Sequence, residues 1–291
     1  MNSFDALFRP FDLRPLHLRS RIVMAPMTRW KSPDQFPGPD VAAYYRRRAE
    51  NGVGLIVTEG TTIDHPTSSY SVRVPAFHGA ALDGWRRVVD GVHEAGGRIV
   101  PQIWHVGPMR HPSNDYPNRH LPNASPSGLF RPGGKQASAP LTRTEIKEIT
   151  DSFARAAADA RALGFDGVEI HGAHGYILDA FLWEGLNIRD DEYGGDAVAR
   201  TRFAVEVVSA VRAAVGADFP VILRISQWKQ QDYGARLAET PERLKATLQP
   251  IADAGVDMFG CLLRRRWGPE ISGSDMKLAG WIRGMLGKTT F

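Results

Sequence analysis

The segment His171-Gly172-Ala173-His174-Gly175-Tyr176 places two imidazoles and a phenol within six residues. It directly follows the expected strand Val168-Glu169-Ile170, and its small residues allow a flat ligand to approach the backbone. The two imidazoles could donate hydrogen bonds to one oxygen atom, and the phenol could deliver a proton to a neighbouring atom of the same molecule. His171, His174 and Tyr176 are therefore candidate catalytic and substrate-binding residues.

Two other interpretations of this segment remain open at the level of sequence. The histidines could be structural, bonded to backbone groups in a tight turn between a strand and a helix. The His-x-x-His spacing could also chelate zinc, with Glu59 as a nearby third ligand, whereas Cys261 is remote in sequence. Because no third ligand is convincing, we expect no metal.

Polar residues also follow other expected strands. Thr28, Glu59, Gly60 and Gln102 stand at strand ends, and Arg224 interrupts the apolar run Val-Ile-Leu-Arg-Ile-Ser. A buried arginine needs an anion, carbonyl groups or an acidic partner on a neighbouring strand. A hydroxyl, an amide and a guanidinium around one opening are the donors and acceptors expected for a planar heterocycle.

Two further polar segments have simpler interpretations. Residues 187–195 (Asn-Ile-Arg-Asp-Asp-Glu-Tyr-Gly-Gly) are typical of a structural turn held by Asn and Asp side chains. Residues 264–266, three consecutive arginines, are typical of a solvated loop but could attract a phosphate.

Short apolar runs alternate six times with helical patterns, which predicts a parallel sheet covered by helices. The capping-box spacing of Thr142 and Glu145 marks one helix start. The expected strands span 22–25, 55–58, 98–103, 168–170, 220–225 and 257–262, and the expected helices span 40–51, 83–94, 144–163, 197–215, 240–254 and 276–286.

A (β/α)8-type barrel and an open doubly wound sheet both fit this alternation. No G-x-G-x-x-G follows the first strand, which favours the barrel. We expect one domain over residues 1–291 with about six βα units, lacking strands seven and eight, although 287–291 resembles the start of a seventh strand. Residues 14–22 are expected to form a hairpin at the lower end of the barrel, and 104–141 a long loop or lid after strand three.

Composition narrows the class of protein. The chain of 291 residues is 43% hydrophobic and 23% charged, with a formal net charge of +4, which makes no case for nucleic-acid binding. A single cysteine, the absence of an 18-residue apolar run and the absence of a signal-like start predict a cytoplasmic protein without a membrane segment. An open sheet would leave two unpaired edges, so homo-oligomerisation is an open alternative.

At this point the sequence resembles the old yellow enzyme family of FMN-dependent ene-reductases. The pieces that carry the resemblance occur in family order over nearly the whole chain: APMT at 25–28, TEGT at 58–61, QIWHVG at 102–107, HGAHGYILDAFL at 171–182, NIRDDEYGG at 187–195, LRIS at 223–226 and GSDMKLAGW at 273–281. The most specific is HGAHGY followed by the DEYGG turn. The family fold is an eight-stranded barrel, in agreement with the pattern of strands.

The resemblance implies roles residue by residue. His171 and His174 would bind the carbonyl oxygen of the substrate, and Tyr176 would protonate the carbon α to that carbonyl. The residues that would contact FMN are Pro26, Met27, Thr28 near the O4/N5 edge, Gly60, Gln102 at the pyrimidine side and Arg224 near N1/O2.

The expected activity is reduction of the C=C bond of an α,β-unsaturated carbonyl compound, with FMN as cofactor and NAD(P)H as reductant. Two alternatives are kept. One is a truncated, non-catalytic relative that binds flavin weakly or needs a partner to complete the barrel. The other is a metal-dependent hydrolase using His171 and His174.

Overall fold

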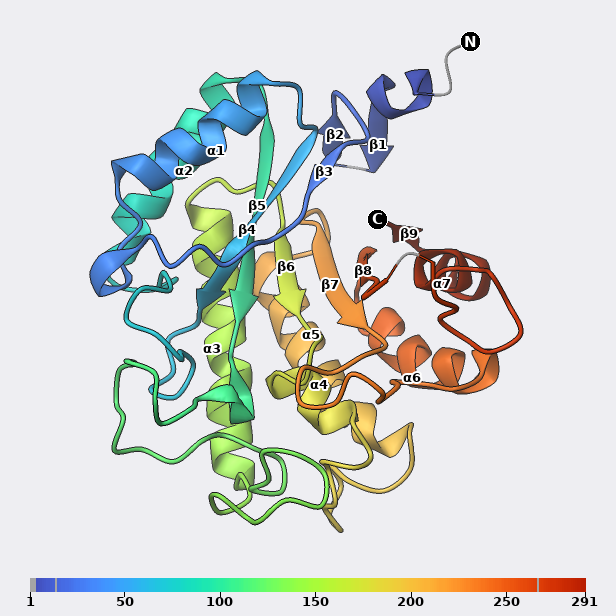
Figure 1. Cartoon of the computed structure of the whole chain (residues 1–291). Helices are drawn as coiled ribbons and strands as arrows, with labels where there is room; N and C mark the ends of the chain where they lie inside the picture. The colour runs from blue at the N-terminus through green and yellow to red at the C-terminus, as the bar shows by residue number, and fades with distance from the viewer. Residues whose placement is uncertain (1–3, 14, 266) are drawn as a thin grey trace.

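The fold is known from a computed structural model that describes residues 4–13, 15–265 and 267–291. Seven parallel strands form one curled sheet in the order β3-β4-β5-β6-β7-β8-β9, and β1 and β2 form a separate antiparallel hairpin. Helices cover the outer face of the sheet, and the strands run from the end near the N-terminus toward the end where α4 lies (Figure 1). This is the α/β barrel arrangement that the alternation of strands and helices predicts.

The elements follow in chain order. The strands are β1 (Phe11–Leu13), β2 (Leu16–Leu18), β3 (Val23–Met24), β4 (Leu55–Thr62), β5 (Arg98–Trp104), β6 (Val168–His171), β7 (Val221–Ser226), β8 (Met258–Leu262) and β9 (Thr289–Thr290). The helices are α1 (Pro39–Glu50), α2 (Ala81–Glu94), α3 (Arg143–Ala162), α4 (Ile177–Leu182), α5 (Arg202–Val215), α6 (Pro241–Asp253) and α7 (Leu278–Leu286), and the 3-10 turns are η1 (Asp5–Phe8), η2 (Pro33–Gln35), η3 (Gly107–Met109) and η4 (Ala199–Thr201).

All six expected strands and all six expected helices are present, with shifted ends. The capping box at the start of α3 is confirmed, because the Thr142 side chain accepts from the Glu145 backbone N–H and the Glu145 side chain accepts from the Thr142 N–H. Strand β4 continues through Glu59 to Thr62, four residues beyond the expected end, and is buried throughout. The residues at 287–291 do begin a seventh strand, since β9 pairs in parallel with β8.

The hairpin lies earlier in the chain than expected. Its register pairs Phe11 with Leu18 and Leu13 with Leu16, so it occupies 11–18 rather than 14–22. Arg14, within the expected span, lies outside the described residues. Leu16 and Leu18 pack against Leu55 and other side chains at the amino end of the sheet. The expected location at the lower end of the barrel is therefore confirmed, and only the boundaries were wrong.

Arginine side chains hold the long segment between β5 and α3 in place through hydrogen bonds to its backbone carbonyls. The guanidinium of Arg110 donates to the carbonyls of Pro117, Asn118, Leu121 and Pro122. From the 187–195 turn, Arg189 donates to the carbonyls of Pro126 and Leu141, at 2.7 Å each. The turn therefore has a structural role, as its composition predicts, and the structure adds that it holds the long loop.

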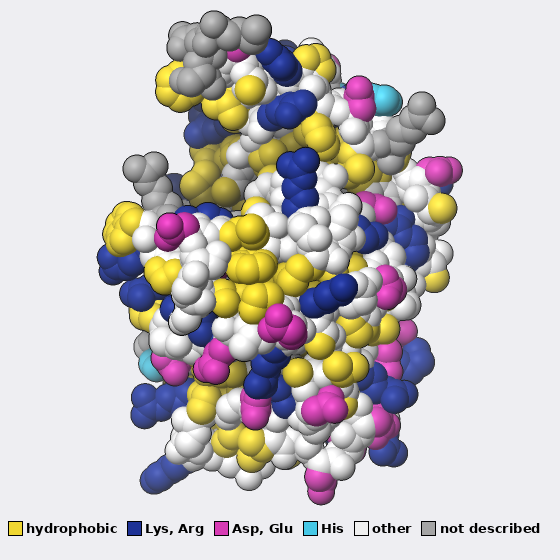
Figure 2. Space-filling view, turned by 90° about the vertical axis from the view of Figure 1, so that its right-hand side faces the viewer, with side chains coloured by type: hydrophobic (Ala, Val, Ile, Leu, Met, Phe, Trp, Pro, Cys, Tyr) yellow, Lys and Arg dark blue, Asp and Glu magenta, His cyan; other side chains and the backbone are white. Residues whose placement is uncertain are grey.

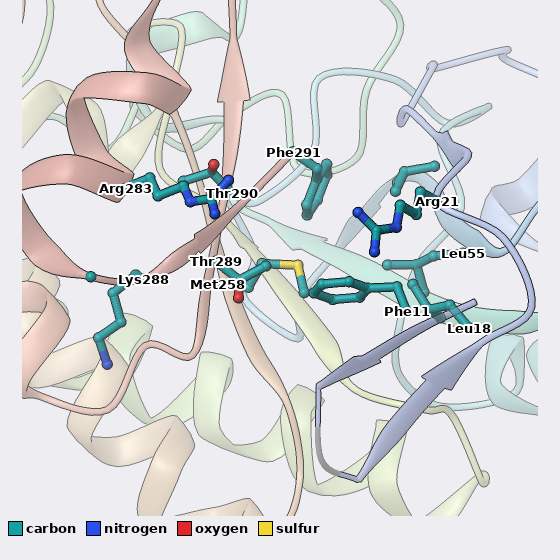
Figure 3. A pocket seen from close by; sticks show the side chains of 12 residues that line it. Phe11, Leu18, Arg21, Leu55, Met258, Arg283, Lys288, Thr289, Thr290 and Phe291 are labelled. Atoms are coloured by element: carbon teal, nitrogen blue, oxygen red, sulfur yellow. The ribbon is translucent and has the colours of Figure 1, made fainter. Parts of the chain in front are cut away.

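The sheet does not close among the described residues, because β3 pairs only with β4 and β9 only with β8. A cavity of about 530 Å³ lies between these two edges. Phe11, Met258 and Phe291 point into it and Arg21 and Arg283 face it from opposite walls (Figure 3). Figure 2 views this side and shows hydrophobic side chains in the hollow below the N-terminal segment. The opening lies at the amino end of the strands, away from the candidate catalytic residues.

Candidate active site

A smaller cavity lies at the carboxyl ends of the strands, where the chemistry of α/β barrels takes place. Its volume is about 160 Å³. Residues from five strands and the loops that follow them meet there. The lining residues are Pro26, Thr28, Gln102, Trp104, His171, His174, Tyr176, Arg224 and Leu262, seven of which the sequence singles out.

The two imidazoles and the phenol lie against one another on one wall of this cavity. The ring centroid of His171 is 5.2 Å from that of His174 and 4.9 Å from that of Tyr176. Trp104 lies beside them, 4.7 Å from the Tyr176 ring and nearly parallel to His171. The predicted cluster is therefore assembled, and its members face a common space.

The protonation states of this cluster follow from its burial. Burial, with the nearby His174 and Arg224, lowers the pKa of His171 well below its ordinary value. Burial, with the positive charges of Arg224 and Lys229, lowers the pKa of His174 to about 3. Burial and the neighbouring Tyr70 raise the pKa of Tyr176. At neutral pH the wall therefore presents two neutral imidazoles and a neutral phenol, and all three can donate hydrogen bonds.

The hydrogen bonds of the two histidines differ. Nδ1 of His171 accepts from the Ala173 backbone N–H at 3.3 Å, which leaves its Nε2 as the donor. Nε2 of His174 is buried and has no hydrogen-bond partner within the described part of the chain. A buried ring nitrogen without a partner costs free energy unless a ligand satisfies it. The alternative in which backbone groups satisfy both histidines therefore does not hold for His174.

His174 lies in a turn rather than in a helix. Its φ is +65°, and Gly175 follows at +81°, so the right-handed helix begins only with α4 at Ile177. A hydrogen bond to α4 stabilises the turn: the Gly175 N–H donates to the Asp179 carboxylate at 2.7 Å. This backbone directs the two imidazoles toward each other instead of placing them one helical turn apart.

An adjoining wall is polar and built on three adjacent strands. Gln102 on β5 donates through Nε2 to Oε2 of Glu169 on β6, at 2.6 Å. Nη1 of Arg224 on β7 lies 3.8 Å from Oε1 of Glu169, an oxygen for which the described residues offer no hydrogen-bond partner. The sequence alternative of an acidic partner on a neighbouring strand is thus correct for Arg224. Because that contact is long, the guanidinium keeps donors free for the cavity.

Glu169 itself was missed by sequence reasoning. It is fully buried, and burial raises its pKa while Arg224 and Gln102 oppose that change. The signal was present, since an acidic residue inside an apolar strand needs a partner for the same reason as Arg224 does. The carboxylate fixes the Gln102 amide so that its carbonyl oxygen is left to accept from a ligand.

The remaining predicted cofactor residues divide into two groups. Pro26 and Thr28 line the cavity, and a hydrogen bond joins the side chains of Thr28 and Tyr70. Met27 is 51% exposed and does not line the cavity. Gly60 lies under the Trp104 ring, and an added Cβ there would come within 2.4 Å of that indole. Contacts of all four residues with a cofactor stay predictions.

The zinc alternative has no support among the described residues. No group of three or more His, Cys, Asp or Glu side chains is arranged there to hold a metal ion. The Glu59 carboxylate already accepts hydrogen bonds from Nη2 and Nε of Arg29, at 2.6 Å and 2.9 Å, and from the Tyr45 hydroxyl. In the basic run after β8, Arg264 lies over the Tyr233 ring, while Arg266 is outside the described residues.

We expect the stability of the protein to fall as the pH drops from 6.5 to 5. Burial lowers the pKa of His65 to about 4, and it lowers the pKa values of His105, His171 and His174 as well. The unfolded chain therefore binds more protons below pH 6.5, and each histidine adds up to about 1.4 kcal/mol per pH unit to the slope. The free energy of unfolding in urea, measured across this range, tests the expectation. His65→Asn should flatten the slope, whereas the same change at exposed His111 should not.

Comparisons with known proteins agree with this fold. The sequence profile of the NADH:flavin oxidoreductase / NADH oxidase family matches residues 6–262. The solved structure of morphinone reductase in complex with tetrahydroNAD is 31% identical, with a TM-score of 0.82, and the match covers 98% of this chain and 78% of that one. The old yellow enzyme homologue from Zymomonas mobilis is 27% identical, with a TM-score of 0.83, over 98% and 81% of the two chains.

The fold and the cavity at the carboxyl ends of its strands define a flavin-oxidoreductase barrel. The chain belongs to the NADH:flavin oxidoreductase family, in which the old yellow enzymes are found.

Curated relatives from rice (Oryza sativa subsp. japonica) are similar over most of this chain. It is 41% identical to 12-oxophytodienoate reductase 7 over 232 residues and 43% identical to 12-oxophytodienoate reductase 1 over 216 residues. These matches cover 76% and 72% of this chain, and 58% and 56% of the relatives. The chain thus spans a little over half the length of the curated relatives it matches. None of its described helices is long and apolar enough to cross a membrane.

Proposed function

We propose that this chain is an FMN-dependent oxidoreductase that reduces the C=C bond of α,β-unsaturated carbonyl compounds, with NAD(P)H as reductant. The single observation that supports it best is that a wall of two neutral imidazoles and one phenol and an adjoining wall of amide and guanidinium groups line one cavity. The first wall suits an oxygen that gains negative charge, and the second suits the polar edge of a flavin.

The donor set fits the polar edge of the isoalloxazine. Arg224 has donors to spare, the carbonyl of Gln102 is free to accept, and the Thr28 hydroxyl lines the same cavity. Bound FMN would supply the hydride chemistry, accepting a hydride from a nicotinamide and passing one to the β carbon of the substrate. Arg224 would hold the negative edge of the cofactor, with Glu169 keeping both side chains in place.

The chain's own residues would handle the substrate. Nε2–H of His171 and a ring N–H of His174 would donate to the carbonyl oxygen, and their hydrogen bonds strengthen as that oxygen gains charge. Tyr176 would give its hydroxyl proton to the α carbon. The buried rings of Trp104 and Tyr176 would exclude water from this step. Because both imidazoles stay neutral, the substrate would be held by hydrogen bonds and not by a fixed positive charge.

The experiment that tests the function uses the chain mixed with FMN under anaerobic conditions. NADPH or NADH should bleach the bound flavin, and an enone such as cyclohexenone should restore its colour with formation of the saturated ketone. A chain that binds FMN but never returns its colour with any activated alkene contradicts the proposal.

Arg224→Met is expected to weaken FMN binding by roughly 10- to 100-fold. A charge-assisted hydrogen bond contributes about 1.5–3 kcal/mol, and about 1.4 kcal/mol corresponds to a tenfold change in affinity. Titration of flavin fluorescence gives the dissociation constant. The matched control is Arg46→Met, which removes an exposed arginine that pairs with Glu50 and Glu94 on the outer helices. Equal affinities of the two variants would remove Arg224 from the cofactor site.

A second candidate function is supported by the open sheet. The outer edges of β3 and β9 are unpaired among the described residues, and the cavity between them has an apolar floor. A strand supplied by another polypeptide would pair with both edges, so the chain would act only as part of an assembly. Failure to bind FMN alone, with recovery in a larger complex, favours this candidate.

A further inference from the structure

The end of β7 and the loop that follows it, residues 226–230, contact the turn that carries the two catalytic candidates His174 and Tyr176. The backbone N–H of His174 donates to Oγ of Ser226 at 3.1 Å, and the backbone N–H of Gln230 donates to the His174 carbonyl at 3.2 Å. The Trp228 ring packs on the His174 ring, with centroids 4.5 Å apart. The conformation of His174 at positive φ is therefore held from residues 226–230, about fifty positions further along the chain.

One contact of this loop reaches the phenol itself. Nε2 of Gln230 donates to the Tyr176 hydroxyl oxygen at 2.8 Å. A phenol oxygen that accepts this hydrogen bond still has its own hydrogen to donate elsewhere. Since the Tyr176 side chain lines the cavity, the free direction for that hydrogen is the cavity.

Among the residues that the structure describes, the other neighbours of the phenol make no hydrogen bond with it. Trp104 and His171 pack on its ring edge-on, and His174 lies 6.3 Å away between centroids. Tyr70 acts electrostatically to raise the pKa of Tyr176, as burial does, and the hydrogen bond from Gln230 is the influence that lowers it. Both imidazoles are neutral because burial lowers the pKa values of His171 and His174.

We propose that Gln230 is the positioning residue for the proton donor: its amide orients the Tyr176 hydroxyl toward the substrate and stabilises the phenolate that remains after proton transfer. This inference rests on the proposed function and adds a residue that the sequence did not indicate. In the step concerned, the O–H bond of Tyr176 breaks and a C–H bond forms at the α carbon. The electron pair of the O–H bond stays on the phenolate oxygen, which solvent reprotonates.

The first measurement needs neither flavin nor substrate. The protein is labelled with 3-fluorotyrosine, which makes the phenol more acidic, and the ¹⁹F resonance of position 176 is assigned by its loss in Tyr176→Phe. Gln230→Met keeps the length of the side chain and removes the donor. It should raise the pKa of the labelled Tyr176 by about one to two units, since a hydrogen bond to a charged group contributes about 1.5–3 kcal/mol.

The matched control comes from the next position. The Gln231 amide belongs to the same loop and donates to the Gly175 carbonyl at 3.2 Å, without contacting the phenol. Gln231→Met should leave the titration of Tyr176 where it is in the parent. A shift of equal size in both variants would mean that the loop acts through general packing and would overturn the proposal, as would no shift in Gln230→Met.

A second variant keeps the test independent of how well the first one folds. Gln230→Glu replaces the donor by a carboxylate that can only accept when ionised, so the phenol hydrogen turns away from the cavity. It should raise the pKa of the labelled Tyr176 at least as far as Gln230→Met does. An unchanged or lowered pKa would contradict the proposal.

Turnover then separates this inference from the proposed function. In the FMN-loaded protein, Gln230→Met should lower kcat for enone reduction about 10- to 100-fold with KM within about twofold, and leave the rate of flavin reduction by NADPH unchanged. If the parent reduces no enone while the fluorine titration shifts as expected, the proposed function fails and the positioning role stands. If the parent is active and neither the titration nor kcat changes, the positioning role fails alone.

Discussion

Tyr176→Phe is expected to slow enone reduction by about 10²- to 10⁴-fold, which is the usual contribution of a general acid. The phenyl ring keeps the edge-on contacts with Trp104 and His171, so the cavity keeps its shape. Only the hydroxyl proton is lost, and the carbanion character at the α carbon must then be quenched by water. Stopped-flow absorbance of the flavin separates the two halves of the reaction.

Flavin reduction by the nicotinamide should be largely unaffected in Tyr176→Phe, because that half of the reaction takes no proton from the phenol. Tyr193→Phe is the matched control, since its hydroxyl contacts Glu206 at 3.0 Å, remote from the cavity. Equal loss of both half-reactions in Tyr176→Phe would show that the phenol matters for cofactor binding instead of proton donation.

The second large effect is expected on stability, at the buried ion pair between Lys229 and Asp179. Their side chains are 0% and 1% exposed, and the Lys229 ammonium donates to the Asp179 carboxylate. Lys229→Met leaves a carboxylate without its counter-charge in a dry environment and should cost about 3–5 kcal/mol. Urea denaturation of the variant and the parent measures this difference.

A double variant decides whether the cost comes from the unpaired charge. Lys229→Met with Asp179→Leu buries no charge and should recover most of the stability that either single change loses. For comparison, Lys147→Met breaks the exposed ion pair between Lys147 and Asp151, whose side chains are 74% and 46% exposed. This change should lower the free energy of unfolding by less than about 1 kcal/mol. A loss as large in the double variant as in the single one would show that packing, not charge, sets the effect.

The pair also explains how the site is held together. Asp179 lies in the first turn of α4 and its carboxylate accepts from the Gly175 N–H, while the backbone of Lys229 lies alongside that of His174 in a parallel bridge. One buried ion pair thus joins the turn after β6 to the loop after β7. A variant that breaks the pair should therefore also loosen the geometry of His174 and Tyr176.

Much of the fold was predictable because its signals are local. The strands β5 and β7 are mostly apolar runs, and the helix α3 has a capping box at its start and Gly164 after its end. The cluster of His171, His174 and Tyr176 was predictable for the same reason, because all three stand within six residues at the end of a strand.

The features that sequence reasoning missed are either too short to give a pattern or depend on contacts between distant segments. Helix α4 has only six residues directly after the His-Tyr motif, too few for a periodic pattern to stand out. The polar end of β4, from Glu59 to Thr62, looks like a loop in sequence, but Arg29 and Tyr45 satisfy Glu59 and let the strand continue. The role of Gln230 follows only from the packing of one loop on another.

The left-handed backbone at His174 sets a limit on how this site can be redesigned. Asparagine and glycine adopt that conformation most readily among the replacements, whereas valine, isoleucine and threonine clash with their own backbone. In a saturation library at position 174, the folded clones should be enriched in asparagine, the one of the two tolerant residues that can also donate a hydrogen bond to a carbonyl group. Selectivity would therefore be tuned more freely at neighbouring positions than at this one.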